Sequence, residues 1–306
     1  MCAVGYCFLK KPISEERTKK NMIKKKKLLV CTFSGGRTSA FMGKFLLEYD
    51  KYKSFEKLFI FCNTGKEDEK TLQFINKCDK EWDLNLVWIE AVINKEKGKG
   101  TDFKVVDFSS ASRNGEPFSD MLDVYPMPTI MGSNCTRELK LTPMNKYIKS
   151  LGYKNVITAM GIRYDERHRK SNTAKEKNLV YPLIDDILVD EQMIRNWWDK
   201  QSFDLELKDY QGNCDLCFKK SERKRLTIIK ENPLTAKWWL DMELKHSTDI
   251  TPRFDLRNNL SIDQLIERSK LPFSSVKDKH DLRKNQLTIE DEDINDVSFD
   301  CFCKAS

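Results

Sequence analysis

Short apolar runs alternate along the chain with segments in which apolar residues recur every three or four positions. The runs Leu28–Phe33, Lys57–Cys62 and Leu86–Ala91 have the length and the β-branched or aromatic content of buried strands. The segment that starts at Ser39 and the segment Glu69–Trp82 have the spacing of amphipathic helices. Strands and helices therefore alternate, and the near-continuous apolar strands predict an α/β fold with a parallel sheet.

Between residues 92 and 134 this rhythm is interrupted by recurring glycine and proline, which predicts a long irregular stretch. It resumes with a helix over Thr142–Leu151, a strand over Asn155–Met160 and a helix that Asp190 caps. Further on, a Ser-x-x-Gln capping box predicts a helix over Ser261–Ser269.

Charge marks off the N-terminal segment. The 306-residue chain has a net charge of +7, and residues 1–27 account for all of it with nine Lys and Arg against two Glu. We expect three regions: a basic disordered tail over 1–27, a nucleotide-binding sheet domain over 28–200, and a mostly helical, cysteine-bearing region over 201–306. A basic tail can contact nucleic acid, although a solvated tail is the simpler interpretation.

Hydropathy predicts no contact with a membrane, because no apolar run approaches the roughly 18–20 residues of a membrane helix. The first residues place their apolar positions before the charges, which is the wrong order for a secretory signal, so we expect a cytoplasmic protein. Ten cysteines in that reducing compartment do not predict a disulfide framework. Three of them fall in core positions of strands or helices (Cys31, Cys62 and Cys78), and two lie in the tail (Cys2 and Cys7).

The first strand is joined to the first helix by Ser34-Gly35-Gly36-Arg37-Thr38-Ser39. Glycines allow several backbone N–H groups to point into one concavity, and the helix that follows adds its free amides and the positive end of its dipole. The hydroxyls add donors, and Arg37 adds charge. These features predict a phosphate cradle at the carboxyl end of the first strand; a tight turn with an ordinary Ser/Thr cap is the alternative.

The same loop resembles the PP-loop of the adenine nucleotide α-hydrolase superfamily, and further blocks resemble its phosphoadenosine phosphosulfate (PAPS) reductase branch. These blocks occur in the family's order between about residues 28 and 220. They are Asn63-Thr64-Gly65 with Glu67, Cys135-Thr-Arg-Glu-Leu-Lys140 with Pro143, Gly161-Ile-Arg-Tyr-Asp-Glu-Arg-His-Arg169, Tyr181-Pro-Leu183, and Gly212-Asn-Cys-Asp-Leu-Cys-Phe218.

The resemblance implies a doubly wound, five-stranded parallel sheet of the HUP/PP-loop type, with ATP or another adenine nucleotide along the strand ends. It places the Asn63-Thr64-Gly65 loop close to the nucleotide, where Asn63 or Thr64 would hydrogen-bond the sugar or the base. A simple Asn-x-Gly turn is the alternative interpretation of that loop.

The block that begins at Gly161 combines arginines with carboxylates at the end of a predicted buried strand. Arginine offers a planar fork that suits phosphate or sulfate oxygens, so we expect Arg163 and Arg169 to bind anions, with Arg163 also catalytic. Asp165 and Glu166 are expected to orient these forks or to hold Mg²⁺.

Five cysteines remain, and they suit a metal centre: Cys135, Cys214, Cys217, Cys301 and Cys303. Four thiolates bind either a [4Fe–4S] cluster or zinc, and free thiols are the third alternative. The branch that reduces adenosine phosphosulfate carries a Cys-Cys…Cys-x-x-Cys set, and Asn134 stands where its first cysteine would be. The resemblance therefore implies Cys135, Cys214 and Cys217 as ligands, with Cys303 or Cys301 as the fourth.

Two reactions suit this constellation. In the first, the enzyme cleaves ATP between the α- and β-phosphates, adenylates an acceptor and transfers sulfur from a sulfur donor; the full glycine pair favours this reaction. In the second, it reduces PAPS or adenosine phosphosulfate, with Cys301 or Cys303 attacking the sulfate sulfur and a thioredoxin-like reductant releasing sulfite. A non-catalytic module that binds nucleotide or nucleic acid is the third hypothesis.

Overall fold

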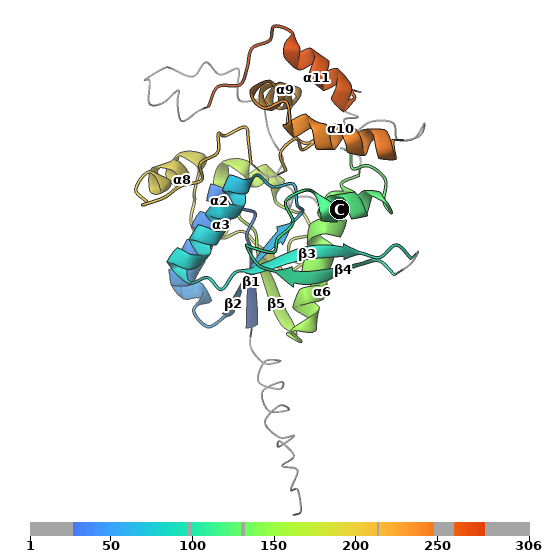
Figure 1. The fold of residues 1–306 in the computed structure, drawn as a ribbon. Coiled ribbons are helices and arrows are strands. Elements are labelled where there is room, and N and C mark those ends of the chain that lie inside the picture. Colours follow the sequence, from blue (N-terminus) through green and yellow to red (C-terminus); the bar gives the residue numbers. More distant parts are fainter. Residues whose placement is uncertain (1–26, 97–98, 130–131, 213, 248–259, 279–306) are drawn as a thin grey trace, which may run out of the picture.

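A six-stranded sheet forms the centre of the protein in the computed structural model, which describes residues 27–96, 99–129, 132–212, 214–247 and 260–278. The strand order is β4-β3-β2-β1-β5-β6, and β4 alone among these strands runs antiparallel to its neighbour (Figure 1). The strands are β1 (Lys27–Thr32), β2 (Glu56–Asn63), β3 (Val87–Ile93), β4 (Thr101–Val106), β5 (Asn155–Ala159) and β6 (Leu179–Val180).

Helices cover both faces of this sheet, with α2 and α3 on one face and α6 on the other (Figure 1). The fold is therefore the doubly wound α/β arrangement that the sequence predicts. The helices of the sheet region are α2 (Arg37–Glu48), α3 (Glu69–Trp82), α4 (Glu116–Leu122), α5 (Asn134–Thr136), α6 (Thr142–Ser150), α7 (Pro182–Asp185) and α8 (Glu191–Trp198), with short 3₁₀ turns η1 (Asp50–Tyr52) and η3 (Tyr164–Arg169).

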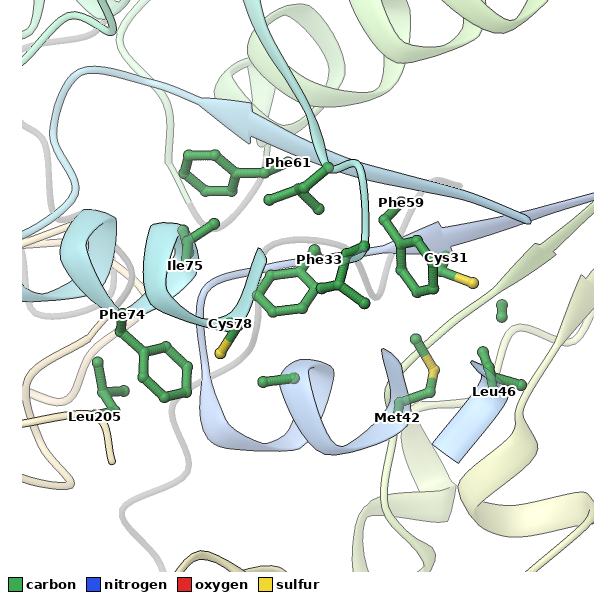
Figure 2. Packing of buried hydrophobic residues seen from close by; sticks show 14 of the residues in the cluster. Cys31, Phe33, Met42, Leu46, Phe59, Phe61, Phe74, Ile75, Cys78 and Leu205 are labelled. Atoms are coloured by element: carbon green, nitrogen blue, oxygen red, sulfur yellow. The ribbon is translucent and has the colours of Figure 1, made fainter. Parts of the chain in front are cut away.

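Alternate residues of β1 fill two cores, because side chains of a strand point to opposite faces. Leu29 and Cys31 join the cluster beneath α2 and α3, whereas Leu28 and Val30 pack beneath α6. Figure 2 shows the first cluster, in which residues of α2 and α3 meet the strands around Phe33. Cys31, Cys62 and Cys78 are all buried in these cores, as predicted, and burial raises the pKa of the Cys62 thiol to about 12.

The expectation of an irregular stretch between residues 92 and 134 is wrong in part. It contains β4, which pairs with β3, and the short helix α4. Strand β4 was missed because it is an edge strand with only one residue, Thr101, buried, so its sequence lacks an apolar run. The sheet accordingly has six strands rather than the five that the family resemblance implies.

A π-helical turn, η2 (Arg137–Leu141), lies between α5 and α6, so residues 134–150 form one continuous helix with a wide turn inside it. Two charged side chains of this turn, Glu138 and Lys140, are buried. Glu138 accepts hydrogen bonds from Arg137 and from Thr101 of β4. The wide turn thus directs polar groups of the Cys135 block into the protein.

The C-terminal helices gather beyond the carboxyl ends of the strands (Figure 1). They are α9 (Glu222–Glu231), α10 (Thr235–His246) and α11 (Ile262–Lys270), and α11 begins with the predicted capping box of Ser261 and Gln264. They share a hydrophobic cluster with α4 and with residues of the Cys135 block. Among the described residues, we find no helix of the length and apolarity that crossing a bilayer requires.

Candidate functional site

The phosphate loop, residues Ser34–Ser39, lies at the carboxyl end of β1. The strand order reverses between β1 and β5, and ligands of open α/β sheets bind at such a switch point. The loop closes on itself through Ser39, whose hydroxyl accepts from the Ser34 N–H at 3.1 Å and donates to the Gly36 carbonyl at 2.9 Å. The chain therefore holds the predicted cradle in a fixed shape.

Gly35 is required by the geometry of this loop. Its φ is +83°, and an added Cβ would lie 2.5 Å from Cγ2 of Thr71 in the first turn of α3. Gly36 precedes α2, whose first turn receives no hydrogen bond from a capping side chain and contains no acidic residue. The positive end of the α2 dipole therefore faces the cradle without an internal anion, which suits phosphate.

Arg37 points away from the cradle. Its guanidinium forms a two-point ion pair with Asp204, at 2.7 and 2.8 Å, and also donates to the carbonyl of Leu205. Trp198 of α8 donates its indole N–H to the Arg37 carbonyl at 3.1 Å. The Arg37 side chain thus links the segment after α8 to the start of α2. Only the backbone of Arg37, and not its guanidinium, then remains for the predicted phosphate contact.

The Gly161 block lies directly beside the phosphate loop. An added Cβ at Gly161 would be 3.3 Å from the Cα of Ser39, so a glycine permits the close approach of the two segments. Arg163 follows and pairs with Asp165 at 2.9 Å, with Glu166 and Glu191 at 3.7 and 3.8 Å. Burial alone would lower the pKa of the Arg163 guanidinium, but these carboxylates raise it above its ordinary value.

Arg169 is buried and pairs with Glu166 at 2.6 Å. Asp165 and Glu166 therefore hold Arg163 and Arg169 in place, and anion binding by these two arginines stays a prediction. Glu191, in the first turn of α8, is a third carboxylate that sequence reasoning missed, because it lies 28 positions from Arg163 in the chain and in no motif.

The Asn63-Thr64-Gly65 loop is buried at the carboxyl end of β2. The amide of Asn63 donates to Glu90 of β3 at 2.6 Å and to the carbonyl of Ser112 at 2.8 Å. Glu90 is fully buried and also accepts from the N–H and hydroxyl of Ser112. The side chain of Asn63 is therefore committed to protein partners. The predicted contact of this loop with sugar or base stays a prediction.

Glu67, three residues after Thr64, is buried and accepts from the N–H and hydroxyl of Thr64 at 2.9 and 2.8 Å. Its other oxygen, Oε1, has no hydrogen-bond partner and lies 3.8 Å from Nζ of Lys140 in the π-helical turn. The Asn63 block and the Cys135 block, which are far apart in sequence, thus meet around one buried carboxylate.

The cysteines Cys135, Cys214 and Cys217 are buried in the same hydrophobic cluster. The Sγ of Cys214 lies 3.6 Å from the hydroxyl of Thr64, so the Cys-x-x-Cys turn adjoins the Asn63 block. In the described part of the chain, however, no three Cys, His, Asp or Glu side chains are close enough to hold a metal ion. The predicted Cys301 and Cys303 lie outside the described residues.

As a half-site the Cys214–Cys217 turn fits an iron–sulfur cluster, since it offers two soft sulfur ligands in an apolar setting. A third and fourth ligand are not assembled around it among the residues described here. The carboxylates Asp165 and Glu166 likewise form no ready magnesium site, because both are occupied by arginine. The metal assignments therefore stay predictions.

Two buried carboxylates in this region, Glu67 and Glu90, received no role from the sequence alone. A signal for Glu90 was present, because it interrupts the apolar run Leu86–Ala91, and a charge in a buried strand requires partners. For Lys66 and Asp215, which form an ion pair at 3.0 Å, no such local signal exists.

Comparisons with known proteins agree with this geometry. Residues 28–180, half of the chain, match the family model described as phosphoadenosine phosphosulfate reductase domain. An uncharacterized nin region protein of Escherichia phage lambda is 35% identical over 199 residues, which cover 64% of this chain and 67% of that protein. An uncharacterized protein of Methanocaldococcus jannaschii is 28% identical over 185 residues, which cover 58% of this chain and 38% of its own length.

Proposed function

Because the chain belongs to the phosphoadenosine phosphosulfate reductase domain family, we propose that it is an enzyme that binds ATP at residues 34–39 and cleaves it between the α- and β-phosphates for sulfur transfer. The observation that carries the proposal is the phosphate loop: Gly35 at positive φ, a first turn of α2 without a side-chain cap, and the close approach of Gly161. Together they give a glycine-dependent backbone loop in front of an uncapped helix start at the switch point of the sheet, which supports phosphate binding there.

The reaction begins with attack of an acceptor oxygen on the α-phosphorus of ATP. A new bond forms between that oxygen and phosphorus, the bond to the bridging oxygen breaks, and pyrophosphate leaves with both electrons of that bond. A sulfur nucleophile from a sulfur donor then displaces AMP from the adenylated acceptor. Neither step changes an oxidation state, so neither needs an electron donor.

The residues of this chain have separate tasks in that scheme. Backbone amides at Gly35 and Gly36 and the hydroxyl of Thr38 hold the phosphates that leave, whereas the hydroxyl of Ser39 closes the loop by donating to the Gly36 carbonyl. The guanidinium of Arg163, kept charged by its carboxylate neighbours, stabilises negative charge as it develops on the reacting phosphate. Asp165 and Glu166 keep that guanidinium oriented, and Mg²⁺ accompanies the nucleotide.

Cys135, Cys214 and Cys217 would hold a [4Fe–4S] cluster, with Cys303 or Cys301 as the fourth ligand and zinc as the alternative metal. A cluster bound there would supply iron sites for redox or sulfur chemistry. The supporting observation is the burial of these three cysteines in one apolar cluster beside the Asn63 block. A Cys214→Ser variant of anaerobically purified protein tests the assignment: it should lose brown colour and bound iron, whereas Cys78→Ser should keep both.

Pyrophosphate release tests the proposed reaction. The full-length, anaerobically purified protein with ATP and Mg²⁺ should release pyrophosphate and AMP, because in the absence of an acceptor a water oxygen attacks the α-phosphorus and pyrophosphate leaves. Arg163→Ala should lower the rate of release about 100-fold or more, as removal of a charge-stabilising donor does in other enzymes. Arg167→Ala is the matched control, because the exposed guanidinium of Arg167 lies over Tyr164 and pairs with no carboxylate of the Arg163 group.

Sulfonucleotide reduction is the second candidate, and the two cysteines near the C-terminus, Cys301 and Cys303, favour it. Sulfite release from PAPS or adenosine phosphosulfate with thioredoxin, without pyrophosphate release from ATP, would replace the first proposal by this one. If the protein bound adenine nucleotides but formed neither product, a nucleotide-binding module would be the function that remains.

A further inference from the structure

The loop after β2 and the cysteine turn form a small ladder. The N–H of Asp215 donates to the carbonyl of Lys66 at 3.1 Å, and Glu67 and Cys214 form an antiparallel bridge. The Thr64 hydroxyl lies 3.6 Å from the Cys214 sulfur. Backbone pairing thus joins two segments that are about 150 residues apart in the sequence.

Side chains lock this ladder. The ammonium of Lys66 pairs with Asp215 at 3.0 Å and lies over the ring of Trp238, 4.7 Å from its centroid. The other carboxylate oxygen of Asp215 accepts from the indole N–H of Trp239 at 2.5 Å. The Lys66 side chain is only 10% exposed, so this ion pair is largely shielded from solvent.

The same loop leads directly to the phosphate cradle. Residue 67 is followed by Asp68, which caps α3, and Thr71 in the first turn of α3 packs against Gly35. A contiguous path of contacts therefore runs from Gly35 through the first turn of α3 to Lys66 and on to the cysteine turn. Packed paths of this kind can carry an energetic effect between two sites when both bias the same element.

We propose that Lys66 and Asp215 are positioning residues that lock the Cys214–Cys217 turn to the loop after β2, so that nucleotide binding at the phosphate loop restrains the cysteine turn. The inference rests on the proposed nucleotide site and deepens it. It gives the cysteine turn a fixed place relative to the phosphates. Because coupling of this kind is reciprocal, a restrained cysteine turn also favours nucleotide binding.

Amide hydrogen exchange on the full-length protein tests this coupling, because the bond from the Asp215 N–H to Lys66 is itself an exchange probe. Saturating ATP with Mg²⁺ should slow exchange in peptides that cover residues 34–39. It should also slow exchange at 214–218 by about fivefold or more, the lower end of typical coupling between sites.

Lys66→Met removes the charge and keeps the length of the side chain, and Lys66→Arg restores the cation. In Lys66→Met, ATP should still slow exchange at 34–39 but no longer at 214–218, whereas Lys66→Arg should respond as the wild type does. Asp215→Asn breaks the same ion pair from the other side and should repeat the Lys66→Met result. It serves in its place if Lys66→Met does not fold.

The possible results distinguish a failure of the coupling to the cysteine turn from a failure of the proposed nucleotide site. Slowing at 34–39 without slowing at 214–218 in the wild-type protein overturns the coupling and leaves the nucleotide site intact. A wild-type response of both Lys66→Met and Asp215→Asn overturns the positioning role. If neither ATP nor PAPS slows exchange at 34–39, the nucleotide site itself is wrong, and the coupling falls with it.

Discussion

Two tryptophan pairs dock helices onto two parts of the site, the phosphate loop and the cysteine turn. In each pair the second ring is buried and donates its N–H, while the first lies edge-on to it with centroids 4.8 or 4.9 Å apart. Trp198 donates to the backbone carbonyl of Arg37, whereas Trp239 donates to the carboxylate of Asp215. The packing is alike, and the acceptors differ in charge.

This difference shows how each part keeps its shape. The phosphate loop is determined by its own backbone, through a glycine at positive φ and a serine that closes the loop, so its tryptophan only supports it. The cysteine turn relies on charged side chains from outside itself: Lys66 pairs with Asp215, and Lys220 donates to the Cys214 carbonyl at 2.9 Å. We expect backbone changes to damage the first region most and side-chain changes to damage the second.

The largest effect should follow Gly35→Ala, which combines an unfavourable φ with a Cβ too close to Thr71. We expect a loss of about 2–4 kcal/mol in the free energy of unfolding, the sum of a left-handed residue and local overpacking. Chemical denaturation measures it. Gly152→Ala is the control, because Gly152 has φ +78° but open space around its Cβ position, and only about 1–2 kcal/mol should be lost. Equal losses in both variants would show that the close approach of Thr71 to the added Cβ adds nothing to the cost of the left-handed backbone.

Trp239→Phe should rank next, because it removes a hydrogen bond to a carboxylate while keeping most of the ring packing. A bond to a charged group contributes about 1.5–3 kcal/mol, and we expect a loss of that size in thermal or denaturant unfolding. Trp238→Phe keeps the bond to Asp215 and should lose less. The idea that charge fixes the cysteine turn would be contradicted if Trp238→Phe proved the more damaging change.

Glu90→Gln should cost about 1–2 kcal/mol near neutral pH, since it weakens bonds to Asn63, Ser112 and Lys104. Burial alone would raise the pKa of Glu90, but the hydrogen bonds from these donors bring it below its ordinary value of 4.5. Its ionised form therefore stabilises the fold above pH 4.5, and this stability is lost as the pH falls through the lowered pKa.

The melting temperatures of the wild type and of Glu90→Gln should accordingly converge as the pH falls from 6 to 3. Lys104→Met keeps the carboxylate and removes one donor, so its curve should lie between the two. A gap between wild type and Glu90→Gln that stays constant with pH would mean that charge on Glu90 contributes nothing to the junction of β2 and β3.

Trp198→Phe should have the smallest effect, because the bond it removes ends on a neutral carbonyl. We expect a loss of about 0.5–1.5 kcal/mol, with Trp197→Phe as the control that keeps the bond. Unfolding curves of the four tryptophan variants, measured together, compare the two regions directly. A Trp198→Phe loss larger than that of Trp239→Phe would reverse the order proposed for them.

The sequence predicted the elements that depend on local pattern. The helix over Glu69–Trp82 is found with the predicted ends, and Asp190 and Ser261 cap helices as expected. A helix that buries one face has apolar residues with a period of 3.6, and this period can be recognised in the sequence alone. Strand β4 was not predicted, because an edge strand needs no apolar run. It forms by pairing with β3, and its own sequence carries no signal of that partner.

The site was predictable as a set of motifs but not as an arrangement. Residue types predicted carboxylate-held arginines at Arg163 and Arg169, and the ion pairs with Asp165 and Glu166 are present, whereas phosphate binding at Ser34–Ser39 stays a prediction. The turning of Arg37 toward Asp204 depends on a residue 167 positions away in the chain. Such contacts follow from tertiary packing, which single-sequence patterns do not encode.

The π-helical turn at Arg137–Leu141 has a consequence for insertions and deletions. It holds one residue more than a regular turn, so deleting a single residue there would let the helix return to 3.6 residues per turn. The wide turn absorbs that extra residue, so the segments on its two sides would keep their facing, whereas a deletion in the regular turns of α6 would rotate the upstream segment by about 100°. Cys135 would therefore stay in its apolar cluster, and Met144 and Ile148 in theirs. A homologue with a one-position alignment gap at this turn is expected to carry its thiol on the same side of the helix.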